Sequence, residues 1–376
     1  MGAQEPHALL ARLGAVARPA GSATEAAARS YCSQVLSAAG FEVSERAFSY
    51  SAFPGLWGTP LIGVALLLTA VVTSFSLMHS SAAEGPAVRA LVIVAILSVC
   101  GWWLSRFGTR YMPLMHRRGV NLEAHRGVPA VWLVAHLDSK SQSVSLLTRA
   151  GAAVAVVGFW VAVAIALVVS SVVHVPVTLI AVLIICAGIA AVPLALARTG
   201  SNGSGALDNA SGVASIIVAA QRMRAETPLG LVITSAEELG LAGARAWVEG
   251  KPSSVAINCD GVDDMGELTL TASGRGEEIA RSLARSSIIG PKVRIRKNLP
   301  GVLLDSTAFS DSGWAACTVS QGRLKSLARI HTRRDRLDEC SGSGVERAGE
   351  LIATIAGAII AEGNGFAPMD GGSVSS

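Results

Sequence analysis

Charged residues are scarce in this sequence of 376 residues, since Asp, Glu, Lys and Arg make up 15% of it and hydrophobic residues 51%. The mean hydropathy is +0.49. An average soluble protein carries about 25% charged residues, so this composition excludes an ordinary soluble protein, and it excludes disordered and collagen-like chains as well. The shortage of charge indicates a protein with membrane-embedded segments.

Cysteine is also sparse, and its spacing forms no known pattern. The six cysteines include no CxxC pair, and Cys100 and Cys186 lie within apolar runs. A disulfide framework and a cysteine-based zinc knuckle are therefore excluded, and reduced thiols are expected. The N-terminus lacks a long apolar run, so we expect no cleaved signal peptide. The net charge of +4 requires no nucleic-acid partner, because arginines beside the apolar runs account for much of the basic excess.

The apolar residues concentrate in four blocks, which we predict to be transmembrane helices. They cover residues 56–78, 88–105, 150–173 and 176–197. At ~1.5 Å per residue, each helix can cross a hydrocarbon core of ~30 Å. Buried helices of a soluble protein are the alternative, but such helices rarely run so long without a polar face. Short links join the blocks in pairs, which predicts two transmembrane hairpins, 56–105 and 150–197.

Two hairpins return the chain each time to its starting side of the membrane. Residues 1–55, 106–149 and 198–363 are therefore expected to form one domain, and the Gly/Ser-rich tail 364–376 is expected to be disordered. The loops on the far side carry only one arginine, Arg89. The helix ends on the domain side carry six, which are Arg106, Arg110, Arg117, Arg118, Arg149 and Arg198. The positive-inside rule then predicts a multi-pass membrane protein whose domain lies in the cytoplasm.

Strands and helices alternate outside the apolar blocks. Ser22 and Glu25 form a capping box that begins a helix, and an extended stretch follows at 41–50. Nearly continuous apolar runs, typical of strands in a covered sheet, occupy residues 130–135, 229–234 and 254–258. Helical patterns separate these runs, and this alternation predicts an α/β fold.

Polar residues follow several of these strands, at the edge where ligands bind in an open α/β sheet. They are His136, Asp208, Glu238, Asp260 and His331. Two imidazoles and three carboxylates suit zinc, with manganese or cobalt as alternatives, and a shared carboxylate is usual when two ions are bound. Asp263 and Asp264 are alternatives to Asp260, which we prefer because it directly follows an apolar strand.

Two more carboxylates accompany these residues. Asp138 comes two residues after His136, so on an extended chain it points the same way and can accept the second imidazole N–H. Glu237 and Glu238 are neighbours at a strand end and point in opposite directions. One of the two can therefore bind metal while the other faces the water and takes its proton.

The segments that contain these residues resemble the M28 family of dinuclear zinc aminopeptidases. In chain order they are 135–139, 206–214, 236–243 and 331–335. Several motifs in the family's order make the likeness far more specific than a lone HxD, and it covers essentially the whole soluble part. The resemblance implies a zinc-dependent exopeptidase-like fold, in which helices sandwich an eight-stranded mixed β-sheet, and two Zn²⁺ ions bridged by Asp208.

The resemblance also implies a role for each residue. His136 and Asp260 would complete one zinc site, and Glu238 and His331 the other. Glu237 would be the general base. Asp335 is expected to be a structural group rather than a ligand.

The sequence departs from the family in three places. The interval between His136 and Asp208 is longer than usual, and the predicted hairpin 150–197 accounts for most of the excess. Segment 305–309 only loosely resembles a stretch that contributes to the family's substrate pocket. None of the three tyrosines obviously corresponds to the tyrosine that some relatives place near the developing oxyanion.

These observations predict a membrane-anchored metallopeptidase, most simply an aminopeptidase that hydrolyses peptide bonds with a metal-activated water. The expected partners are a peptide substrate and the lipid bilayer. Because Asp138 and Asp208 are close in sequence to Arg149 and Arg198, a membrane-associated peptide is also expected. The alternatives are a glutaminyl-cyclase-like acyltransferase with a single zinc and a non-catalytic binding module on the same fold.

Overall fold

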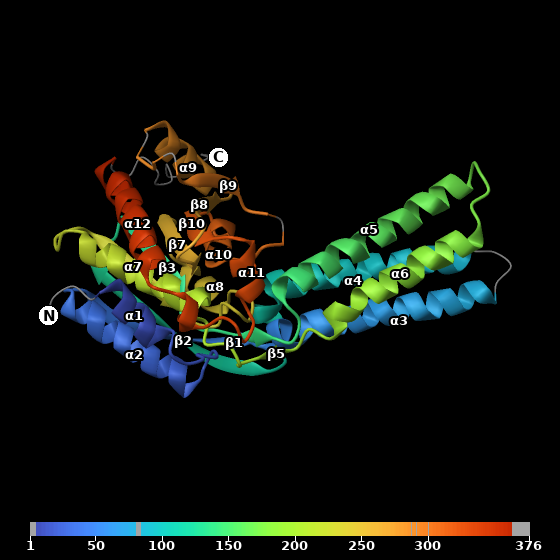
Figure 1. The fold of residues 1–376 in the computed structure, drawn as a ribbon, viewed down its shortest axis with the longest axis horizontal. Coiled ribbons are helices and arrows are strands. Elements are labelled where there is room, and N and C mark those ends of the chain that lie inside the picture. Colours follow the sequence, from blue (N-terminus) through green and yellow to red (C-terminus); the bar gives the residue numbers. More distant parts are fainter. Residues whose placement is uncertain (1–4, 80–83, 287, 291, 300, 363–376) are drawn as a thin grey trace, which may run out of the picture. The chain divides into compact units, whose positions relative to one another are not determined.

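The computed structural model describes residues 5–79, 84–286, 288–290, 292–299 and 301–362 (Figure 1). The tail 364–376 lies outside the described residues. The chain divides into two compact units. Unit 1 consists of Met1–Tyr50, Arg117–Ser141 and Ser201–Ser376, and unit 2 consists of Ser51–His116 and Gln142–Gly200.

Unit 1 is built on a mixed sheet of eight strands in the order β1-β2-β6-β3-β7-β10-β8-β9. The strands are β1 (Glu42–Ser51), β2 (His116–Arg126), β3 (Val131–His136), β6 (Leu229–Thr234), β7 (Val255–Val262), β8 (Glu267–Ala272), β9 (Arg294–Lys297) and β10 (Ala315–Gly322). Strands β6, β3, β7 and β10 run parallel, whereas β2 and β8 are antiparallel to β6 and β10. The predicted mixed α/β fold is therefore confirmed.

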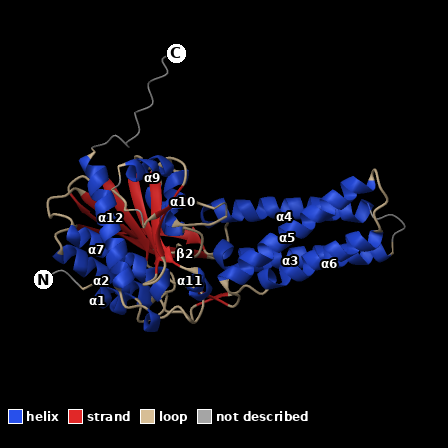
Figure 2. Cartoon of the chain, turned by 45° about the horizontal axis from the view of Figure 1, so that its top comes forward, coloured by secondary structure: helices blue, strands red, loops and turns tan. Residues whose placement is uncertain are grey.

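Helices cover both faces of this sheet (Figure 2). The first face packs on α1 (Pro6–Leu13), α2 (Ala23–Ala38), α7 (Ser211–Arg222), α9 (Gly276–Arg285) and α12 (Ser343–Ala361), and the second on α8 (Ala242–Val248) and α10 (Asp305–Asp311). Strand β3 shows how the sequence divides between the faces. Leu133 and Ala135 belong to the first core, whereas Trp132 and Val134 belong to the second. A continuous apolar run thus fills both layers, because successive side chains point to opposite faces.

Local signals set the ends of several elements. Ser22 Oγ accepts the N–H of Glu25 at 3.1 Å, and the Glu25 carboxylate accepts the N–H of Gly21 at 2.7 Å, so the predicted cap of α2 is present. Gly40, at φ 82°, follows this helix in the left-handed region that glycine adopts without strain. Strand β9 ends the sheet order, and its residues are exposed.

Unit 2 contains four long apolar helices, α3 (Thr59–Met78), α4 (Glu84–Tyr111), α5 (Leu146–Ser170) and α6 (Val177–Ala195). All four are long and apolar enough to cross a membrane. Helix α4 extends past the apolar block 88–105 at both ends. Hydropathy marks only the apolar part of a helix, whereas the helical backbone continues into the polar residues on either side. Two short strands, β4 (Ser141–Gln142) and β5 (Thr199–Gly200), form a separate sheet.

Close packing holds the helices of unit 2 together. Helix α3 packs against α4 and α6, and α5 packs against α6. A Cβ atom at Gly63 would meet the backbone of Ala195, and one at Gly188 would meet the side chain of Ala70. Small residues thus let α3 and α6 approach closely, as in helix pairs in membranes. The outer faces expose large apolar side chains such as Phe75, which lipid can cover.

Candidate metal centre

Polar side chains from separate segments of unit 1 meet at the carboxyl ends of parallel strands. His136 ends β3, Asp260 lies near the end of β7, Glu237 and Glu238 follow β6, Asp208 lies in a helical turn (Ala206–Ala210) and His331 follows α11 (Leu324–Arg329). Every metal ligand named from the sequence lies within two adjacent groups that could each hold an ion, although the groups also include Glu237.

Asp208 lies between the two imidazoles. Its Oδ1 atom is 3.1 Å from Nε2 of His136, and its Oδ2 atom is 2.8 Å from Nε2 of His331. Each carboxylate oxygen thus faces a different histidine. This is the arrangement that a carboxylate shared between two metal ions requires.

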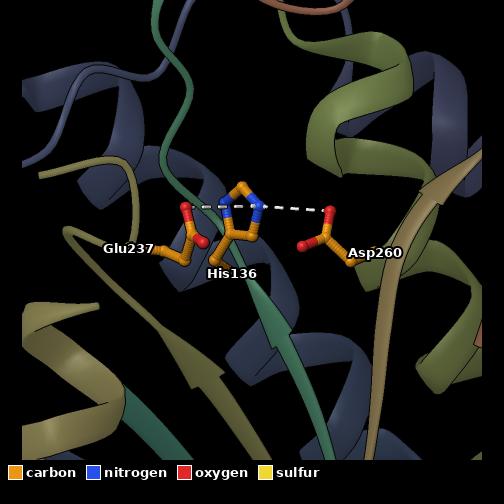
Figure 3. Close-up of side chains that lie close together, drawn as sticks. All are labelled: His136, Glu237 and Asp260. Atoms are coloured by element: carbon orange, nitrogen blue, oxygen red, sulfur yellow. Dashed lines mark ion pairs between the residues drawn. The ribbon is translucent and has the colours of Figure 1, made fainter. Parts of the chain in front are cut away.

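The first metal group consists of His136, Glu237 and Asp260, and the second of Asp208, Glu238 and His331. In the first, Nε2 of His136 is 3.6 Å from Oδ1 of Asp260 and 3.9 Å from Oε2 of Glu237. Figure 3 shows the imidazole between these two carboxylates. In the second, Nε2 of His331 is 3.1 Å from Oε2 of Glu238.

The chemistry of these donors fits divalent zinc. Four carboxylates face two imidazoles at a largely buried site, and uncompensated negative charge there is costly unless a cation binds. Oε1 of Glu238 is buried and has no hydrogen-bond partner among the described residues, so a metal ion could satisfy it. Carboxylate oxygen and imidazole nitrogen are ordinary zinc ligands.

The buried charges shift several pKa values. Burial alone would raise the pKa of Asp208, but His331 and His136 hold it well below its usual value. Burial, reinforced by the charges of Glu238 and Asp260, raises the pKa of Glu237 well above its usual value, although His136 opposes this. A carboxyl group beside a metal group is placed to accept a proton and return it.

Asp138 lies beside His136 as expected, but its two polar groups serve different partners. Its main-chain oxygen is 3.0 Å from Nδ1 of His136, whereas its carboxylate oxygen is 3.8 Å away. The carboxylate accepts the N–H groups of Glu237 at 3.0 Å and Glu238 at 3.2 Å. Buried amides need acceptors, so the side chain orients the two glutamates, and the main chain, not the expected carboxylate, orients the imidazole.

The model of peptidase family M28 matches residues 121–356 of the chain. The chain belongs to peptidase family M28. Membership supports a zinc peptidase, because zinc is typical of the family. Comparison with curated proteins gives no match.

Solved structures show the same fold as this M28 chain. An aminopeptidase from Aneurinibacillus sp. strain AM-1 is 14% identical, with a TM-score of 0.53 over 93% of this chain and 92% of that one. The zinc aminopeptidase BSAP from Bacillus subtilis is 13% identical, with a TM-score of 0.54 over 94% of both chains. A glutaminyl cyclase from Porphyromonas gingivalis is 12% identical, with a TM-score of 0.52 over 95% and 98%.

The other acidic residues considered from the sequence have structural partners in the M28 chain. Asp335 accepts the N–H groups of Leu207 at 2.6 Å and Asp208 at 3.1 Å, so it fixes the turn that carries the bridging carboxylate. Burial and the nearby charge of Asp208 raise the pKa of Asp335 to about 7. Asp263 accepts the hydroxyl of Ser326, and Asp264 accepts the N–H of Gly344 at 2.8 Å.

Arg18 is an organising residue of the site that no sequence pattern indicates. It is fully buried and donates to the main-chain oxygens of Leu137 at 2.8 Å, Ser204 at 2.8 Å and Gly205 at 2.9 Å. Its main-chain N–H also donates to Ser139 Oγ at 2.9 Å. Arg18 therefore connects the segment after His136 with the loop before Asp208.

Asn209 fixes a second pair of segments. Its side chain donates to the main-chain oxygen of Cys259 at 2.9 Å and accepts the N–H groups of Gly212 at 3.0 Å and Gly261 at 3.2 Å. These bonds hold the turn of Asp208 against the strand of Asp260. Its place within the family-like segment 206–214 is the signal that could have identified it.

Proposed function

We propose that the protein is a membrane-anchored dinuclear zinc aminopeptidase. The observation that carries the proposal is Asp208, whose two oxygens face His136 and His331 at 3.1 and 2.8 Å. Asp208 would bridge the ions. His136 and Asp260 would complete the first site, and Glu238 and His331 the second. Membership of the M28 family supports this assignment.

The proposed mechanism assigns the proton transfers to Glu237. When bound, the ions would supply Lewis-acid polarisation of the scissile carbonyl and lower the pKa of the attacking water. Glu237 takes the proton of that water and delivers it to the leaving amine. Asp138 is a positioning residue, because its carboxylate holds the N–H groups of Glu237 and Glu238.

The proposal includes the organisation of the chain. Residues 1–55, 106–149 and 198–363 form the metallopeptidase domain, and 56–105 and 150–197 are inserted transmembrane hairpins. The four candidate spans support this division. The arginines at the helix ends support a cytoplasmic domain. Its substrate would be a peptide, including one associated with the membrane. A reporter that is active only in the cytoplasm should therefore be active when it is fused to the C-terminus. A reporter that is active only outside the cytoplasm should be inactive at the same position.

The test combines metal analysis with a screen of aminoacyl and peptide substrates on the purified full chain. The wild type should hold about two zinc ions per chain and release N-terminal residues. Glu237→Gln should keep the zinc but lower turnover by about 10²- to 10⁴-fold, the usual contribution of a general base. Glu226→Gln is the matched control, because Glu226 is exposed and paired with exposed Arg224. Unchanged turnover in Glu237→Gln would reject the assigned base.

The same experiment separates the alternative functions. About one zinc per chain, together with cyclisation of N-terminal glutamine, would favour a glutaminyl-cyclase-like acyltransferase. Failure to bind any divalent metal would favour a non-catalytic binding module. Cleavage of internal peptide bonds without release of N-terminal residues would keep the peptidase but reject the aminopeptidase.

A further inference from the structure

A lysine lies against the second metal group. Nζ of Lys140 is 2.6 Å from Oε2 of Glu238 and 3.3 Å from the main-chain oxygen of the same residue. The Lys140 side chain is only 16% exposed. Oε2 of Glu238 is also the atom that lies 3.1 Å from Nε2 of His331. The ammonium group therefore contacts an oxygen that belongs to the ligand set of the second ion.

The first metal group has a different electrostatic environment. Among the described residues, the ion-pair partner of both Glu237 and Asp260 is the His136 imidazole, at 3.9 and 3.6 Å. Glu238, by contrast, contacts the Lys140 ammonium at 2.6 Å as well as the imidazole of His331 at 3.1 Å. A lysine thus already compensates part of the charge of the second group, whereas within the described part of the chain no lysine or arginine pairs with the carboxylates of the first group.

The two imidazoles differ in the same sense. Nδ1 of His136 is 3.0 Å from the main-chain oxygen of Asp138, which orients the ring. Nδ1 of His331 is buried and has no hydrogen-bond partner within the described part of the chain. An acceptor behind a metal-binding histidine orients the ring and increases its basicity, and removing such a partner typically lowers metal affinity by about 10- to 100-fold.

We propose that Lys140 makes the second metal group the weaker of the two, so that its ion binds last and dissociates first. This inference rests on the dinuclear zinc site proposed above. A cation at hydrogen-bond distance from Glu238 both compensates this ligand's charge and repels an incoming divalent ion at short range. The second ion must therefore displace Lys140 or share Glu238 with it, whereas no lysine or arginine among the described residues pairs with Glu237 or Asp260 and competes in this way for the first ion. Occupancy of the second site then depends on the free zinc concentration.

The test measures zinc bound per chain across a series of free zinc concentrations, using the full chain in detergent after chelation. The wild type should bind zinc in two resolved steps. Lys140→Met removes the charge but keeps an unbranched side chain, and it should tighten the second step by about tenfold or more while leaving the first unchanged. Lys140→Arg retains a cation and should keep the weak second step. Arg334→Met, which removes an exposed cation three residues after His331, should change neither step.

Each outcome distinguishes this inference from the proposed function. Two steps of equal affinity in the wild type, or an unchanged second step in Lys140→Met, would overturn the role of Lys140 and leave the peptidase intact. One zinc in the wild type and two in Lys140→Met would support the role of Lys140, and would mean that it prevents the second ion from binding over the zinc range used. One zinc in both proteins, or none, would contradict the dinuclear site and the inference together. Circular dichroism of each variant identifies a change that is due to misfolding.

Discussion

The two units of the chain stabilise their interiors by different means. Unit 1 buries charged groups, such as Arg18, Asp138 and Asp335, and satisfies them with main-chain groups of distant segments. Unit 2 buries an almost wholly apolar cluster between helices, and its buried Thr69 donates to the main-chain oxygen of Ala65 in its own helix, at 2.8 Å. The positions of side chains in unit 1 therefore depend on long-range hydrogen bonds, whereas those in unit 2 depend on close packing of small residues.

Arg18→Met should have the largest effect on the free energy of unfolding of unit 1, and it tests whether unit 1 alone depends on long-range hydrogen bonds. Loss of Arg18 leaves at least three buried carbonyl oxygens without their donor, at about 1–3 kcal/mol each, so unit 1 should lose more than about 3 kcal/mol. Hydrogen exchange measured separately on peptides from each unit checks this. Unit 2 should be unchanged. Arg29→Met is the matched control, because Glu45, the partner of Arg29, is largely exposed, and it should cost about 1 kcal/mol or less.

Removal of metal should have a comparable but smaller effect on the same unit. Zinc at 100 to 1,000 times its dissociation constant stabilises a binding-competent fold by about 2.7–4.1 kcal/mol. Chelation should therefore increase exchange in peptides around His136, Asp208 and Glu238, and not in the helices of unit 2. Equal destabilisation of both units would contradict the independence of the two interiors.

An intermediate effect is expected from Gly188→Leu in unit 2. A side chain at Gly188 would meet Ala70, and overpacking of this kind costs about 1–3 kcal/mol. Exchange should increase in α3 and α6 while peptide hydrolysis is retained. Gly158→Leu in α5 is the control, since a Cβ atom there meets nothing within 4 Å. Similar destabilisation by both variants would show that packing against α3 is not the cause.

The smallest effect should come from Thr69→Val. Hydrogen bonds of polar side chains within membrane proteins contribute about 0.6 kcal/mol on average, and that of Thr69 is local to its helix. Thermal unfolding in detergent should therefore shift little. A loss as large as that of Arg18→Met would refute the contrast between the units.

Elements with strong periodicity could be predicted from the sequence. Strand β6 was predicted over 229–234 and is Leu229–Thr234, and α2 begins at the capping box of Ser22 and Glu25. These signals are local, so they do not depend on the rest of the fold. Helix α10, Asp305–Asp311, was not predicted, because its seven mostly polar residues show no apolar stripe. Helix α1 was not predicted either, although the proline in its first turn is a signal for the start of a helix.

The chemistry of the candidate site could be inferred from residue types, but its supporting contacts could not. Several carboxylates and imidazoles at strand ends are informative, because together they form the ligand set of a metal site. Arg18 donates to main-chain oxygens, which every residue has, so no sequence pattern identifies its partners. The Lys140–Glu238 ion pair at 2.6 Å joins two segments that only the folded chain brings together. The Asp138 carboxylate was expected to orient His136, but two backbone amides compete for it more closely.

The exposed strand β9 bears on how copies of the chain meet one another. Its sequence includes Arg294, Arg296 and Lys297 at the end of the sheet order. An unpaired strand edge allows the sheet of a neighbouring chain to join it. Arg294 pairs with Glu267 at 2.6 Å and Lys297 with Glu277 at 3.1 Å. An approaching strand would have to desolvate these charged groups, so sheet-to-sheet aggregation through β9 should be disfavoured.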